Sequence, residues 1–193
     1  MLFSNPEISA YINQNFEPAW ESVRSVPTIT LDFGNGQKVT RTLHGNIATY
    51  VCTADGSIID VIPGVYEPQA YLRQLKKLSE ASRNIMVQSE RQFELISKYH
   101  KDELARNKAL HKLLVEPQTS VEGHGKVELV SDTSHNEWYR RRQIHQMLLK
   151  QSGATPDSFK KALYKNVLHA DLDDPHLGLD KYLSATYPFD DNS

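Results

Sequence analysis

Cys52 is the only cysteine in the 193-residue chain, and it is the one side chain that offers a thiol for chemistry. A single cysteine excludes an intrachain disulfide, a C-x-x-C redox pair and a zinc site built from cysteines. Asp55–Gly56 predicts a two-residue turn between the runs NIATYVCT and SIIDVI, which places Cys52 opposite Ile59. Apolar surroundings in mid-strand raise the pKa of a thiol. We therefore interpret Cys52 as a packing residue, with a redox role as the alternative.

Eight histidines and an acidic C-terminal segment are the other candidates for site chemistry. No pair of histidines combines the i, i+4 helical spacing with a glutamate, as a metalloprotease site requires. His169 and His176 lie near three aspartates, but the spacing is not that of a regular ligand set. Nucleophile elbows, phosphate-binding glycine loops and dinucleotide fingerprints are absent from the sequence. We expect no metal site and no other cofactor.

Three consecutive arginines, Arg140, Arg141 and Arg142, occupy different sides of a helix predicted over 136–151. A nucleic-acid groove needs more basic residues with exposed aromatic side chains between them. The formal net charge of -2 also provides no large basic field. We therefore expect these arginines to pair with the acidic segment 171–191 and not with nucleic acid.

Cap residues and turn residues predict the elements that would position these side chains. Ser4 or Asn5 before Pro6 predicts a helix over 6–15. In the same way, Thr155 before Pro156 predicts a helix over 156–170. The Gly-Asn-Gly triplet at 34–36 predicts a tight turn between two extended runs.

A much longer helix is predicted from residue 68 to about 115, because no Gly or Pro follows Pro68 in that stretch and apolar residues recur at helical spacing. A straight helix of this length would span roughly 70 Å, which exceeds a small domain. It must break, protrude or pair with something, and the thin apolar pattern at 80–84 favours a bend there. Its later apolar stripe would lie on the C-terminal helices or on a second chain.

Composition and element order divide the chain into three parts: 1–78, a long amphipathic helix over 79–116, and a helical C-terminal region over 117–193. Residues 117–136 carry the signature of a linker, with a possible short strand at 126–130. No run of 18 apolar residues and no signal-peptide pattern occurs, so we expect no membrane interaction.

Residues 3–78 resemble the latter part of a thioredoxin-like domain. NPEISAYINQNFEPAW resembles the helix and Asn-Phe passage that follows the family's active-site motif, and ATYVCTADGSIIDVIPGVYEPQAYLRQL resembles its closing strand, Asp-Gly turn, strand and helix. The surroundings of DDPHLGL are similar to helical extensions of uncharacterised bacterial thioredoxin-like proteins. The resemblance implies an α/β fold, with a thioredoxin-like sheet and flanking helices, followed by a long helix and a small, mainly helical C-terminal region.

The departures from this family affect its active site. The catalytic C-x-x-C would lie at or before Met1, and the cis-proline would fall in the loop Gly45, Asn46 and Ile47, which contains no proline. We therefore expect a redox-inactive thioredoxin-like protein that binds a protein partner or self-associates through the 79–116 helix. The alternatives are a thiol-disulfide oxidoreductase with its C-x-x-C upstream of Met1 and a single-cysteine sensor that uses Cys52. The compartment is cytoplasmic if the chain is complete, and the protein is exported if an upstream leader is missing from this sequence.

Overall fold

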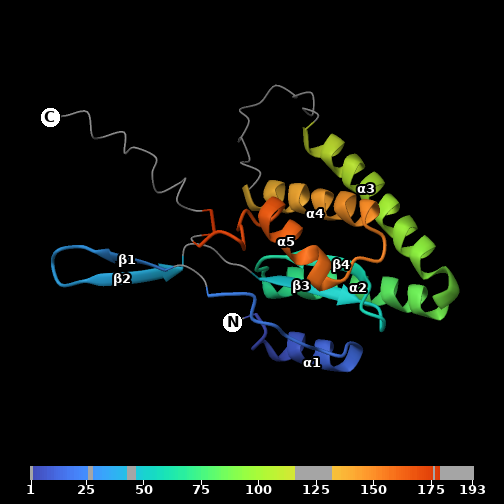
Figure 1. Cartoon of the computed structure of the whole chain (residues 1–193), viewed down its shortest axis with the longest axis horizontal. Coiled ribbons are helices and arrows are strands. Elements are labelled where there is room, and N and C mark those ends of the chain that lie inside the picture. The colour runs from blue at the N-terminus through green and yellow to red at the C-terminus, as the bar shows by residue number, and fades with distance from the viewer. Residues whose placement is uncertain (1, 26–27, 43–46, 116–131, 176, 179–193) are drawn as a thin grey trace, which may run out of the picture.

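The structure is a computed structural model that describes residues 2–25, 28–42, 47–115, 132–175 and 177–178 (Figure 1). These ranges form a mixture of helices and strands, as the sequence predicts. The elements in chain order are α1 (Pro6–Asn15), β1 (Thr28–Asp32), β2 (Lys38–Thr42), β3 (Ala48–Cys52), β4 (Ile58–Pro63), α2 (Pro68–Val87), the 3-10 turn η1 (Ser89–Arg91), α3 (Gln92–Val115), α4 (Asp132–Lys150) and α5 (Pro156–Asn166). None of the described helices has the length and apolar character needed to cross a membrane.

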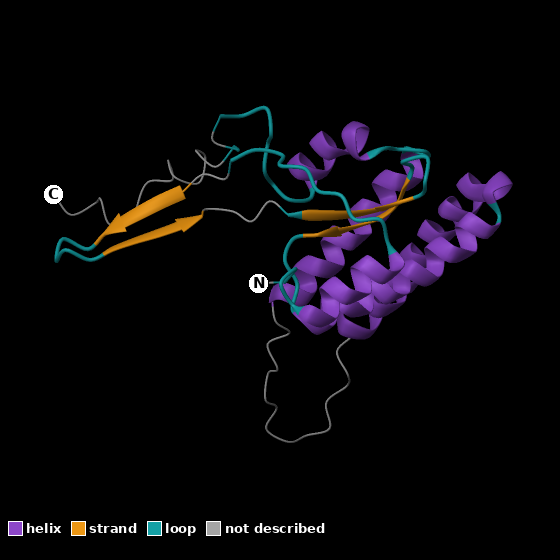
Figure 2. Ribbon diagram, turned by 90° about the horizontal axis from the view of Figure 1, so that it is seen from below, coloured by secondary structure: helices purple, strands orange, loops and turns teal. Residues whose placement is uncertain are grey.

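The strands form two separate antiparallel hairpins, β1–β2 and β3–β4, in the described ranges. The β1–β2 hairpin stands away from the helices (Figures 1 and 2), and none of its described side chains is buried. Its predicted turn is confirmed: Gly34 and Gly36 have φ angles of 72° and 85°, and the Asp32 side chain accepts a hydrogen bond from the Gly34 amide. Glycine adopts such positive φ angles without steric cost.

The β3–β4 turn differs from the prediction by one residue. The Thr53 amide donates to the Ser57 carbonyl, so the loop has three residues, and Gly56 adopts the left-handed conformation with φ 84°. Cys52 consequently lies opposite Ile58 and not opposite Ile59. A register shift between Val51 and Cys52 leaves Ile59 as an extra residue, a β-bulge. From Val51 back to Ala48, on the side of the bulge away from the turn, the strands pair in the predicted register.

Apolar side chains cover both faces of the β3–β4 hairpin. On one face Val51 and Ile62 pack in a buried cluster with α1 and α2. On the other face Ile58 and Val61 pack in a cluster with α4 and α5. Each fully buried aliphatic side chain contributes about 1.5–3 kcal/mol relative to its exposed state. The hairpin is therefore the central layer between two helical layers (Figure 1).

The predicted helical stretch 68–115 is helical and breaks, which is one of the expected alternatives: α2 ends at Val87 and the chain turns through η1 into α3. The break lies beyond the bend expected at 80–84, and the boundary placed at residue 78 falls inside α2. Ile85 and Ile96, on opposite sides of the corner, both pack against the bulged Ile59. This shared contact favours folding the chain back, and α3 then packs against α4, one of the C-terminal helices.

The two predicted caps are confirmed. The Asn5 side chain accepts hydrogen bonds from the amides of Glu7 and Ile8 at the start of α1. Thr155 and Ser158 form a reciprocal capping box at the start of α5. The predicted strand at 126–130 and most of the linker 117–136 lie outside the described residues, and α4 already begins at Asp132.

Candidate functional site

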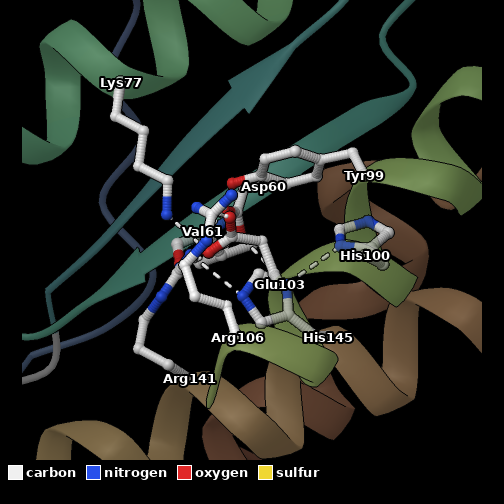
Figure 3. A network of polar contacts seen from close by, with 9 residues as sticks. All are labelled: Asp60, Val61, Lys77, Tyr99, His100, Glu103, Arg106, Arg141 and His145. Atoms are coloured by element: carbon white, nitrogen blue, oxygen red, sulfur yellow. Dashed lines mark hydrogen bonds and ion pairs between the residues drawn. The ribbon is translucent and has the colours of Figure 1, made fainter. Parts of the chain in front are cut away.

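Asp60 is a fully buried carboxylate in the middle of β4, and all six residues of this strand are buried. Its two oxygens accept four hydrogen bonds, and Figure 3 shows the side chains around it. Oδ1 accepts from the Val61 amide at 2.7 Å and from Nη1 of Arg141 at 3.0 Å. Oδ2 accepts from the Tyr99 hydroxyl at 2.6 Å and from Nη2 of Arg141 at 2.5 Å. The carboxylate therefore joins β4 to α3 and α4.

Arg141 of α4 is the counter-charge, and it is also buried. Besides its two bonds to Asp60, Nη1 donates to the Val61 carbonyl and Nη2 donates to Nε2 of His145 at 3.2 Å. Both terminal nitrogens thus use both of their protons. This bidentate geometry is the strongest form of an arginine–carboxylate pair.

The electrostatics keep this pair ionised. Burial by itself raises the pKa of Asp60, but the charge of Arg141 and the hydrogen bonds from Arg141 and Tyr99 outweigh it and hold that pKa below its usual range. Burial lowers the pKa of Arg141, but the charge and hydrogen bonds of Asp60 raise it above its usual range. The pair therefore stays charged at neutral pH, inside the protein.

Two histidines extend the network away from Arg141. Nδ1 of His145 lies 2.9 Å from Nδ1 of His100 on α3, and both rings are buried. Because Nε2 of His145 accepts the proton of Arg141, the neutral ring carries its own proton on Nδ1 and donates it to His100. The proton of His100 is then on Nε2, which is buried and has no hydrogen-bond partner among the described residues.

Both imidazoles are neutral at pH 7. Burial lowers the pKa of His145 to about 3, with Arg141, His100 and Lys77 acting in the same direction against the charge of Asp60. Burial also lowers the pKa of His100. A buried, neutral histidine pair favours the folded state only while the pH stays above the ordinary histidine pKa.

A second ion cluster lies beside the first and joins α2 to α3 (Figure 3). Glu103 of α3 accepts from Lys77 of α2 and from Arg106, each at 2.5 Å. The Glu103 side chain is largely buried, whereas the two cations are more exposed. Together the two clusters connect β4, α2, α3 and α4 through charged groups.

This arrangement holds β4, α3 and α4 together. We call the Asp60–Arg141 ion pair and its hydrogen bonds the clamp. All four donors around Asp60 come from the chain itself, and the carboxylate is fully shielded from solvent. A general base must instead reach the proton that it abstracts from a substrate. The described residues also contain no group of three or more metal-ligating side chains that could hold a metal ion.

Two sequence-predicted candidates, Cys52 and the loop 45–47, are not among the residues of this network. Cys52 is half-buried and packs on the cluster that contains Ile58 and Val61. Burial, with a smaller contribution from the charge of Asp55, raises the pKa of the thiol to about 11. Ile47 is 41% exposed, and its carbonyl accepts from the Gly64 amide at 2.6 Å. Gly45 and Asn46 lie outside the described residues.

The predicted pairing of Arg141 with the acidic segment is wrong, since Arg141 turns inward to Asp60. Arg142 lies over the ring of Trp138 at 5.5 Å. In the described part of the acidic segment, Asp171 and Asp173 pair with lysines of α5 at 2.7 and 2.8 Å. Residues 179–191 lie outside the described ranges.

Sequence reasoning did not identify the Asp60 network as a site. One signal was present: Asp60 interrupts the apolar run IIDVI, and a charge in a buried strand requires a buried partner. Which of the many cations supplies that partner depends on how α4 packs on β4, and spacing in the sequence does not specify this.

We predict that Asp60→Asn lowers the free energy of unfolding by about 3–5 kcal/mol, because it leaves the Arg141 charge buried without a counter-charge. Urea-induced unfolding of the whole chain measures this loss. The matched control is Asp32→Asn, which removes an ion pair with Lys38 that is exposed on both sides and should leave stability unchanged. Equal effects from both substitutions would contradict a buried clamp.

The hydrogen-bond directions predict opposite tautomers for the two buried rings. At pH 7.5, long-range proton–nitrogen NMR correlation should show His100 protonated on Nε2 and His145 protonated on Nδ1. His100→Asn identifies the His100 signals and serves as the control spectrum. Observing the same tautomer in both rings, or two charged rings, would refute this assignment.

Cys52 should react slowly with a thiol reagent, since with a pKa of about 11 roughly one thiol in three thousand is ionised at pH 7.5. We expect labelling of the native chain to be at least about a hundredfold slower than labelling of the same chain unfolded in urea. Comparable rates in the two states would support the sensor alternative.

No protein-family model, no curated protein and no solved structure matches the chain. We therefore infer its function from the residues and contacts of the chain itself.

Proposed function

We propose that this chain is a redox-inactive binding protein that assembles through its projecting β1–β2 hairpin, which we call the arm (28–42). The observation that carries the proposal is the exposure of apolar side chains on the arm: Leu31 is 51% exposed and Phe33 is 61% exposed. An isolated two-stranded hairpin is marginally stable in water. A partner that covers the apolar side chains would stabilise it.

The arm has two chemically different faces. Leu31 lies directly opposite Val39, and side chains two residues apart share a face, so Phe33 follows Leu31 on the same side. The other face is polar: the Thr30 and Thr40 hydroxyls are 3.1 Å apart, and Asp32 pairs with Lys38 at 2.8 Å. An amphipathic hairpin of this kind suits a partner that packs against one face.

The partner that we propose is the arm of a second copy of this chain. Two apolar faces that meet about a two-fold axis are self-complementary and form a small sandwich. Asp32 and Lys38 lie on the polar face, where they pair with each other, so they stay outside this contact. Assembly through the 79–116 region has less support, since α3 packs its buried residues against α4, although Met86 and Val87 at the corner are exposed.

Light scattering coupled to size-exclusion chromatography tests this proposal. We expect the chain to self-associate with increasing concentration, and Leu31→Lys to weaken association at least about tenfold by placing a charge in the apolar contact. The matched control is Thr30→Lys, which adds the same charge to the polar face one residue away and should leave association unchanged. A chain that stays monomeric at every concentration, or equal effects of the two variants, would contradict the proposal.

The second candidate is a thiol-disulfide oxidoreductase whose C-x-x-C segment lies upstream of Met1. The observation that favours it is that β3 pairs with β4 only, among the strands described, so its other edge can accept another strand. A thioredoxin-like sheet, which stays a prediction, would have further strands there. The reading frame upstream of the first codon distinguishes the candidates: an in-frame C-x-x-C would replace the leading proposal.

A further inference from the structure

We propose that His100 and His145 form an acid-sensitive latch, which holds α3 against α4 at neutral pH and releases it when the two imidazoles take up protons. The latch is separate from the arm. One ring belongs to α3 and the other to α4, and both are fully enclosed at the interface beside β4 (Figure 3).

Each ring nitrogen of the latch that lacks a proton already accepts a hydrogen bond, so an additional proton would remove an acceptor. The bond between the two Nδ1 atoms, 2.9 Å apart, requires one donor and one acceptor. A proton added to Nδ1 of His100 makes two N–H groups face each other at this distance. A proton added to Nε2 of His145 faces Nη2 of Arg141 at 3.2 Å, where the arginine already donates. Either protonation converts an attraction into a repulsion.

The surrounding charges do not compensate an added proton. Asp60 on β4 is the nearest anion, with Oδ1 4.0 Å from Nδ1 of His145, but its charge is matched by Arg141. Its four hydrogen bonds also occupy both oxygens.

Glu103 on α3 is the second anion, and it is shared by Lys77 on α2 and Arg106 on α3. Tyr99, the remaining titratable group near the rings, donates its proton to Asp60 and has its pKa raised by burial and by that carboxylate. It therefore stays neutral across the acid range. An additional proton in the latch would be a buried charge without a partner.

The direction and size of the effect follow from linkage. The pKa of His145 is about 3 in the closed latch, against about 6.5 for a solvated imidazole. Since the closed-state pKa is the lower one, the stabilisation is fully present above about pH 6.5 and is lost as the pH falls towards 3. At pH 5, His145 is mostly protonated when the latch is open and mostly neutral when it is closed. This difference lowers the ratio of closed to open latch roughly thirtyfold. The lowered pKa of His100 adds to this in the same direction.

Hydrogen–deuterium exchange of the whole chain tests the latch, because it reports opening element by element. We compare about pH 7.5 with about pH 5 after correction for the intrinsic exchange rate. Backbone amides around His100 in α3 and around His145 in α4 should lose protection roughly thirtyfold or more at the lower pH. The amides of α5, which carries none of the latch residues, should keep their protection.

His100→Asn is the decisive variant. The asparagine Oδ1 can accept the Nδ1 proton of His145 in place of the imidazole, but the side chain does not titrate, so the loss of protection at pH 5 should shrink. The matched control is His169→Asn, at an exposed histidine with φ 53° that asparagine also tolerates. This control should keep the full acid response.

Three outcomes would overturn the proposal. Protection in α3 and α4 that does not change with pH would show that the rings do not gate the interface. A uniform loss in every element, α5 included, would indicate global acid unfolding. An acid response in His100→Asn equal to that of the unmodified chain would show that the imidazole of His100 takes no part in it.

Discussion

The buried ion pair of Asp60 and Arg141 constrains how β4, α3 and α4 pack together. A carboxylate without solvent requires a counter-charge and hydrogen bonds to all its oxygens, and Asp60 obtains them from β4, α3 and α4 together. Arg141 also donates to Nε2 of His145, and this donation sets the direction of the hydrogen bond between His145 and His100. One ion pair therefore positions α3 and α4 on β4 and fixes the protonation of the adjacent rings.

Because of the β-bulge at Ile59, three consecutive residues of β4 contact three different parts of the protein. Ile58 packs towards α4 and α5, Ile59 packs into the corner between α2 and α3, and Asp60 enters the charge network. A regular strand alternates between two faces and offers only two directions. Because of this irregularity, Ile59 packs with Ile85 and Ile96 at the corner between α2 and α3.

Local features of this fold follow from the sequence, whereas the site does not. The caps at Asn5 and Thr155 and the turn at 34–36 are short-range hydrogen-bond and φ requirements that neighbouring residues specify. The bulge at Ile59 and the break after Val87 are set by packing between distant segments. The aspartate in an apolar strand signals a buried partner, but its identity depends on the placement of α4. The thioredoxin-like relationship stays a prediction.

The coupling between Asp60 and Arg141 tests the central claim most directly. A double-mutant cycle compares the free energies of unfolding of the unmodified chain, Asp60→Leu, Arg141→Met and the double variant in urea. The clamp predicts a coupling of about 2 kcal/mol or more, with the double variant more stable than either single variant, because neither charge is then left buried alone. Losses that simply add would contradict it, since two independent residues would then account for the stability of the interface.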